Sequence, residues 1–95
     1  RLYEPTHLKN CWVLGNLGRF YRHIGNYKQA KEMLEKSLEL YQTHHPEAIL
    51  EIAWLTINLG IVYRNVAFYK KAKELIEKGR EIYKHHYPKD NMEVA

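Results

Sequence analysis

The chain contains one cysteine, Cys11, so no disulfide can form within it, and a reducing compartment such as the cytoplasm is expected. No apolar run approaches the roughly 18 residues that a membrane-spanning helix needs, and no signal peptide is visible. Glycine-rich phosphate-binding loops are absent as well. These absences argue against a disulfide-stapled secreted domain, a membrane partner and a nucleotide-binding loop.

The sequence also lacks the residue patterns of catalytic and metal sites. No Ser/His/Asp or Cys/His arrangement is present, so we expect no enzyme activity, no catalytic residue and no cofactor. The histidines of His44-His45 and His85-His86 are neighbours on a helix, and such side chains do not converge on one ion. No metal site is therefore predicted, and Cys11 is expected to be a small buried apolar residue.

The formal charge of +4 and the pI of about 9.2 favour acidic partners but fall short of the dense Lys/Arg clustering of a nucleic-acid binder. Most lysines alternate with glutamates at i,i+4 spacing, for example Lys31 with Glu35, which is typical of a solvated outer helix face. We therefore expect no nucleic-acid partner, and an RNA-binding helical array is the third and least favoured hypothesis.

What the sequence does contain is a repeat with a period of 42 residues, because segment 12–53 can be laid over segment 54–95 without a gap. A fixed period of this length predicts a stacked array, in which each unit covers its neighbour's apolar face. Identical residues in register include Trp12/Trp54, Asn16/Asn58, Gly18/Gly60, Tyr21/Tyr63, Arg22/Arg64, Lys31/Lys73, Glu35/Glu77, Tyr41/Tyr83 and Glu51/Glu93.

Each copy contains two stretches of helical periodicity separated by a short break. We expect helices near 6–24, 27–44, 47–66 and 69–86. In the first helix the pattern directs apolar side chains into the core, and these are Val13, Leu17, Phe20, Tyr21 and Ile24.

The breaks and crossings also carry signals. Asn26 is a predicted N-cap, with Gln29 three residues later as in a capping box. The second break, Ala67-Phe68, lacks both glycine and cap, so its turn is expected to be less well determined. Gly18 and Gly60 are expected where a neighbouring helix comes close.

Proline-containing joints at 44–46 and 86–88 divide the chain, because proline disfavours continuation of a preceding helix. The chain begins without Met and reads as a piece of a longer protein. We expect a single fragment of a repeat array with four parts: residues 1–4 as the tail of a preceding repeat, 5–45 as repeat one, 46–87 as repeat two, and 88–95 as the start of an unfinished third repeat.

The pattern Leu17-Gly18-x-x-Tyr21, followed by Tyr27, Ala30 and Leu34, resembles a tetratricopeptide repeat, and the second copy repeats it. The 42-residue period and the proline joint make the chain similar to the long subtype found in kinesin light chains and in bacterial multi-repeat proteins. The resemblance implies an all-α fold of helix-turn-helix repeats stacked as a short right-handed α-solenoid. It also implies a scaffold whose first helices line a concave groove that holds a peptide.

One subgroup of that family grips a C-terminal carboxylate with a lysine just before the groove asparagine. Gly15 and Ile57 occupy those positions here, so this clamp is not expected.

The candidate peptide-binding residues lie on the first helix of each repeat, on the side that turns away from the predicted core. By the resemblance, this side lines the groove. The candidates are Trp12, Asn16, Arg19, Arg22, His23, Trp54, Asn58, Ile61, Arg64 and Asn65.

The chemistry of these residues suits a peptide ligand. An asparagine amide can pair with both N–H and C=O of a backbone, and arginine forks suit carboxylates or phosphates. The tryptophans fit two roles, ligand anchors or packing between neighbouring helices.

The leading hypothesis is a protein–protein interaction scaffold that binds a peptide of acidic character. The alternative is a structural module for self-association or domain spacing, because a two-repeat piece leaves apolar ends uncovered.

Overall fold

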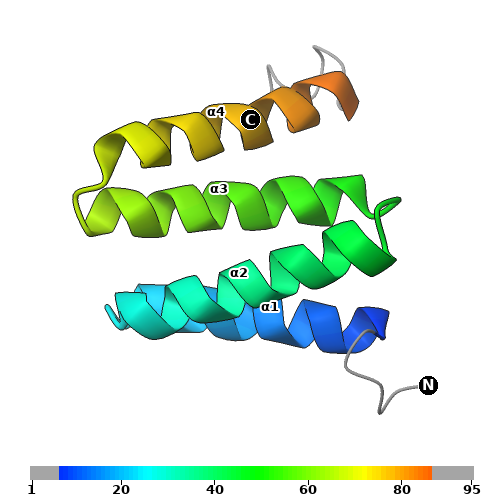
Figure 1. Cartoon of the computed structure of the whole chain (residues 1–95), viewed down its shortest axis with the longest axis horizontal. Helices are drawn as coiled ribbons and strands as arrows, with labels where there is room; N and C mark the ends of the chain where they lie inside the picture. The colour runs from blue at the N-terminus through cyan, green and yellow to red at the C-terminus, as the bar shows by residue number, and fades with distance from the viewer. Residues whose placement is uncertain (1–6, 87–95) are drawn as a thin grey trace.

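The computed structural model describes residues 7–86, which form four helices in succession (Figure 1). Successive helices run antiparallel and stack as two helical hairpins. This confirms the all-α fold of stacked helix-turn-helix repeats, while the predicted preceding tail (1–4) and third repeat (88–95) lie outside the described residues. The helices are α1 (Leu8–His23), α2 (Tyr27–His44), α3 (Ile49–Asn65) and α4 (Tyr69–His86).

The turns of the two hairpins follow their sequences. Asn26 caps α2, since its side-chain oxygen accepts the Gln29 backbone N–H at 3.4 Å, as the sequence predicted. Gly25, at φ 83°, supplies the left-handed residue of the first turn. At the equivalent place in the second turn, Ala67 adopts φ 72°, a conformation that costs a residue with a Cβ energy.

Close helix crossings depend on glycine, as predicted. A Cβ added at Gly18 would lie 2.6 Å from Leu34 Cγ, and one at Gly60 would lie 2.7 Å from Ile76 Cγ1. The absence of side chains at these points brings α1 onto α2 and α3 onto α4.

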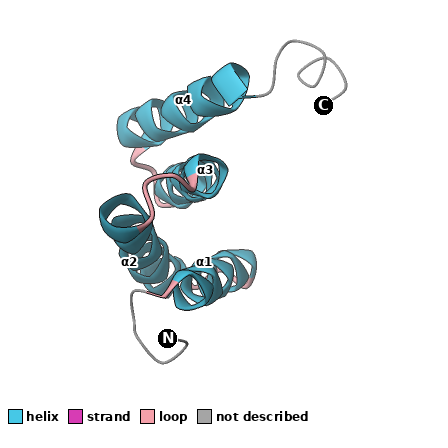
Figure 2. Ribbon diagram, turned by 90° about the vertical axis from the view of Figure 1, so that its right-hand side faces the viewer, coloured by secondary structure: helices cyan, strands magenta, loops and turns pink. Residues whose placement is uncertain are grey.

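The core lies between the hairpins, where α2 packs on both α1 and α3. Figure 2 shows α2 displaced to one side of α1 and α3. Cys11 is fully buried, as expected, and burial raises the pKa of its thiol. The buried apolar side chains of this cluster are Cys11, Ala30, Leu34, Leu40, Tyr41, Leu55, Leu59 and Val62.

The predicted core face of α1 is wrong at four of its five positions, whereas the fifth, Tyr21, packs against the core. Leu17 is 41% exposed and Ile24 59% exposed, and Val13 and Phe20 are exposed too. Instead, α1 buries Cys11, Gly15 and Gly18, with Leu14 and Tyr21 half-buried.

The reason for this error lies in the repeat. The 42-residue equivalents of Val13, Leu17 and Phe20 on α3 are Leu55, Leu59 and Val62, which are buried because α2 precedes them. No helix among the described residues plays that role for α1.

Of the i,i+4 charge pairs expected on α2 and α4, Lys31–Glu35 is the one within ion-pair distance in the described structure, at 3.9 Å. Both side chains are nearly half exposed, so the pair contributes little to stability. Within residues 7–86, no helix is long and apolar enough to cross a bilayer.

Candidate functional site

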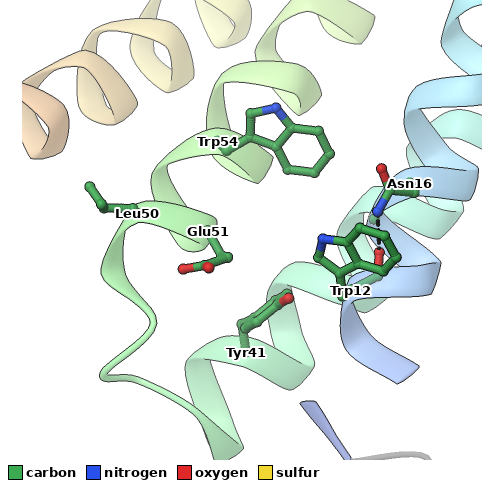
Figure 3. Close-up of a pocket in the computed structure, with 7 residues that line it drawn as sticks. Trp12, Asn16, Tyr41, Leu50, Glu51 and Trp54 are labelled. Atoms are coloured by element: carbon green, nitrogen blue, oxygen red, sulfur yellow. Dashed lines mark hydrogen bonds between the residues drawn. The ribbon is translucent and has the colours of Figure 1, made fainter. Parts of the chain in front are cut away.

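A pocket opens between the N-terminal halves of α1 and α3, with α2 behind it (Figure 3). Its cavity volume is about 190 Å³. We name it the tryptophan pocket, because both tryptophans of the chain line it. Its lining residues are Trp12, Gly15, Asn16, Tyr41, Leu50, Glu51 and Trp54.

Gly15 allows the pocket to form. A Cβ added there would lie 2.9 Å from Leu55 Cδ2 and 3.3 Å from Trp54 Cζ3, so any larger residue would press on the wall of the pocket. Trp54 on α3 therefore packs beside α1, and Trp12, which is 56% exposed, stands opposite with its indole accessible.

Tyr41 and Glu51 supply the polar groups behind the indoles. Tyr41 is 2% exposed, and burial, followed by its interactions with Glu51 and Cys11, raises the pKa of its phenol to about 12. The phenol therefore stays protonated at neutral pH. Glu51 comes from the first turn of α3 and lines the cavity on the α3 side (Figure 3).

The two repeat-related asparagines bond back to their own helices. Asn16 Nδ2 donates to Trp12 O at 2.9 Å, and Asn58 Nδ2 donates to Trp54 O at 2.9 Å. In each of these bonds the amide nitrogen is the donor. The amide oxygen of each asparagine points away from the carbonyl and remains available as an acceptor. Asn58 is buried, whereas Asn16 is half-buried at the pocket edge.

Further along the same side of α1 and α3 lies a group of positive charges, the arginine cluster of Arg19, Arg22 and Arg64. Burial, then the charges of Arg19 and Arg64, lower the pKa of Arg22. Its Nε is buried without a hydrogen-bond partner in the described structure. A desolvated guanidinium beside two others is an electrostatically unfavourable arrangement that an anion would relieve.

Arg19 links the two features, because its guanidinium carbon stands 5.8 Å from the centroid of the Trp54 ring. This is a cation–π contact between α1 and α3. The pocket and the arginine cluster are thus parts of one surface.

Comparison with known protein families gives a match in the first half of the chain. The family described as "Tetratricopeptide repeat" matches residues 1–43. This range contains α1 and nearly all of α2, and it supports the tetratricopeptide resemblance inferred from the sequence. No curated protein matches the chain.

The tetratricopeptide match covers the first repeat, and the internal 42-residue register carries the same pattern into α3 and α4. Tetratricopeptide repeats generally serve as protein–protein interaction modules and are typically non-enzymatic scaffolds. The family match therefore supports a general role in protein–protein interaction.

The structure brings most of the predicted site residues onto one surface. Trp12, Asn16 and Trp54 meet in the pocket, and the three arginines gather beyond it. His23 and Asn65 are exposed at the C-terminal ends of their helices, with His23 Nε2 3.5 Å from Arg22 Nη2.

Two predicted residues are placed differently. Asn58 was expected to face away from the apolar stripe, but it is 5% exposed, and Ile61 is half-buried. The second repeat stacks on the first, so Trp54, Asn58 and Ile61 on α3 are covered more deeply than the α1 residues 42 positions before them. Asn58 therefore lies in the packed interior, where its amide donates to the Trp54 carbonyl.

The sequence-based selection missed Tyr41, Leu50 and Glu51. A signal existed for two of them, because Tyr41/Tyr83 and Glu51/Glu93 are identical across the repeat. The selection was restricted to one face of each first helix, whereas the pocket also takes a side chain from α2 and others from the first turn of α3.

Proposed function

We propose that the chain is an interaction scaffold that binds a peptide segment of a partner protein on the side of α1 and α3 that carries the tryptophan pocket and the arginine cluster. The observation that carries this proposal is the pocket itself, a concave apolar site with a few convergent polar groups. Exposed Trp12 and the arginines are residue types enriched at the energetic centres of interfaces.

The arginine cluster supports a ligand with acidic character. Within residues 7–86, no carboxylate lies within ion-pair distance of Arg19, Arg22 or Arg64. A peptide carboxylate would compensate charges that now repel one another.

The test is a peptide-display selection against the whole chain, followed by affinity measurements on variants. Selected peptides should bind the Trp12→Ala/Arg22→Ala variant at least tenfold more weakly. The matched control is Lys28→Ala/Lys70→Ala, which changes two exposed positions related by the repeat on α2 and α4, and it should bind as the parent does. If the control loses binding and the Trp12/Arg22 variant does not, α2 and α4 carry the interaction surface.

A second candidate function is self-association, favoured by the uncovered apolar face of α1. The equivalent face of α3 packs on α2, where Tyr63 donates to Glu35 Oε2 at 3.1 Å and Lys31 lies over the Tyr63 ring at 5.9 Å. The repeat places identical residues at the two ends of the stack: Tyr21 on α1, and Lys73 with Glu77 on α4.

Helix α4 of a second copy is thus the natural occupant of this α1 face, although Arg80 replaces Leu38 and weakens the match. Light scattering over a concentration series tests the idea. Self-association that disappears in both Phe20→Glu and Glu77→Lys supports it. A monomer at all concentrations, or oligomers that persist in both variants, contradicts it.

A further inference from the structure

The tryptophan pocket differs chemically from the rest of the groove side. Its walls are the aromatic rings of Trp12, Trp54 and Tyr41, and its charged group is the Glu51 carboxylate, whereas the neighbouring surface carries arginines. A cavity of roughly 150 Å³ holds a benzene-sized molecule. The volume of about 190 Å³ therefore suits one side chain of a ligand.

Tyr41 contributes a hydroxyl at the wall of the cavity. The residue as a whole is 98% buried, and it lines the pocket. Figure 3 shows the phenol oxygen directed into the cavity. A hydroxyl oxygen at this place can accept a hydrogen bond from a ligand N–H.

Glu51 adds a negative charge on the same cavity. No described residue forms an ion pair or hydrogen bond with its carboxylate. The carboxylate and the quadrupoles of the two indoles all attract a cation and disfavour an anion. The contact of Arg19 with Trp54 is a cation–π pair of the same kind within the chain.

We propose that the tryptophan pocket binds the lysine side chain of a partner peptide, with its methylene stem between the Trp12 and Trp54 rings and its ammonium donating to Glu51 and to the Tyr41 hydroxyl. This inference rests on the proposed peptide-binding function and names the ligand chemistry of one subsite.

The proposal also gives a spacing for the ligand. Arg19 lies seven residues after Trp12 on α1, which is about 10 Å along a helix. An extended peptide advances about 3.3 Å per residue. A lysine in the pocket would therefore place a carboxylate at the arginine cluster when an acidic residue stands about three or four positions away.

The test uses the fact that both tryptophans of the chain line the pocket. The two indole N–H signals in a proton–nitrogen correlation spectrum then report on this site alone. The whole chain is titrated with three capped tripeptides of the form Gly-X-Gly, in which X is lysine, its neutral analogue norleucine, or glutamate. The lysine peptide should shift both indole signals and bind more tightly than the other two.

Variants define the contacts. Glu51→Gln should weaken lysine binding about two- to fivefold, as loss of a partly exposed ion pair implies. The matched control is Glu39→Gln, at an exposed α2 position outside the pocket, which should leave the affinity unchanged. Tyr41→Phe should weaken lysine binding without weakening norleucine binding, and circular dichroism should show that each variant is folded.

Each outcome decides the matter. Norleucine binding as tightly as lysine, or an unchanged affinity in Glu51→Gln, overturns the lysine subsite and leaves peptide binding in place. If no tripeptide shifts the indole signals, the subsite is also overturned. The proposed function is then judged separately, by whether display-selected peptides lose affinity for the Trp12→Ala/Arg22→Ala variant.

Discussion

Gly79 on α4 packs directly against Ile57 on α3, and the equivalent pair in the first repeat has the glycine on the opposite helix, where Gly15 faces Ser37. Ser37 is fully buried and donates its hydroxyl to Cys11 O at 2.7 Å. The glycine thus lies on the first helix of the first hairpin and on the second helix of the second hairpin. Gly15 leaves space beside Trp54, and Gly79 leaves space for the Ile57 side chain.

This relationship predicts that Gly79→Ser is destabilising, although serine is the residue of the first repeat. A Cβ at Gly79 would collide with the Ile57 side chain and lie 2.9 Å from the backbone oxygen of Ala53. We expect a loss of about 1–3 kcal/mol in the free energy of unfolding, measured by urea denaturation.

The control for Gly79→Ser is Lys78→Ser, on an exposed neighbouring position. The double variant Ile57→Ala/Gly79→Ser should lose less free energy of unfolding than the sum of the two single variants, because Ile57→Ala removes the side chain with which the new Cβ would collide. Strict additivity would show that Ile57 and Gly79 are not coupled.

The turn between α3 and α4 predicts a stabilising substitution. Ala67 has φ 72°, which costs about 1–2 kcal/mol for a residue with a Cβ. Replacing Ala67 with glycine would remove this cost, but part of the stability gained is offset because glycine makes the unfolded chain more flexible. Ala67→Gly should therefore raise the free energy of unfolding by about 0.5–1 kcal/mol, and Ala48→Gly, at φ −81°, should lower it.

The arginine cluster predicts a response of stability to salt. Arg19 and Arg64 add to the burial that lowers the pKa of Arg22, so their repulsion should be screened as sodium chloride is added. The urea midpoint of the parent chain should rise with salt, and Arg64→Gln should reduce this rise. Arg80→Gln, on the exposed side of α4, should leave the salt response as it is.

The same cluster is predicted to govern binding of an acidic peptide. Replacing Arg22 and Arg64 with alanine should weaken binding at least tenfold and flatten its dependence on salt, because charge pairs with the ligand are lost. Isothermal titration at several salt concentrations measures both effects. An unchanged salt slope would mean that these arginines do not contact the ligand.

Tyr41 predicts a loss of stability at high pH. Its pKa is raised to about 12 in the fold, while an exposed tyrosine titrates near 10. The unfolded chain therefore loses this proton first as the pH rises. The stability that the protonated Tyr41 phenol contributes to the fold is fully present below pH 10 and is lost progressively up to about pH 12. Tyr41→Phe should reduce the steepness of this loss in urea-unfolding measurements, and Tyr69→Phe, at an exposed position, should not.

Local signals in the sequence were sufficient for the elements of the fold. The break at Gly25-Asn26 and the proline joint placed the helix ends within about two residues. Gly18 and Gly60 placed the crossings. The core face of α1 was wrong because periodicity identifies an apolar face without telling whether a neighbour covers it, and Leu17 and Ile24 remain exposed.

The site was predictable only in part, for a related reason. Trp12, Asn16 and Trp54 could be found from one face of the first helices. The pocket, however, depends on tertiary placement: Tyr41 enters from α2, and Glu51 enters from the first turn of α3. The burial of Asn58 likewise depends on how the second repeat stacks on the first.

The order of packing has a mechanical consequence. Among the four described helices, the packing of α2 on α3 is less extensive than the packing within each hairpin, α1 on α2 and α3 on α4. A pulling force applied to the two ends should therefore part α2 from α3 before it opens either hairpin. Trp12 and Tyr41 would move with the first hairpin, whereas Glu51 and Trp54 would move with the second, so this first event opens the tryptophan pocket. A bound peptide would thus be released when the two hairpins separate, before any helix leaves its own hairpin.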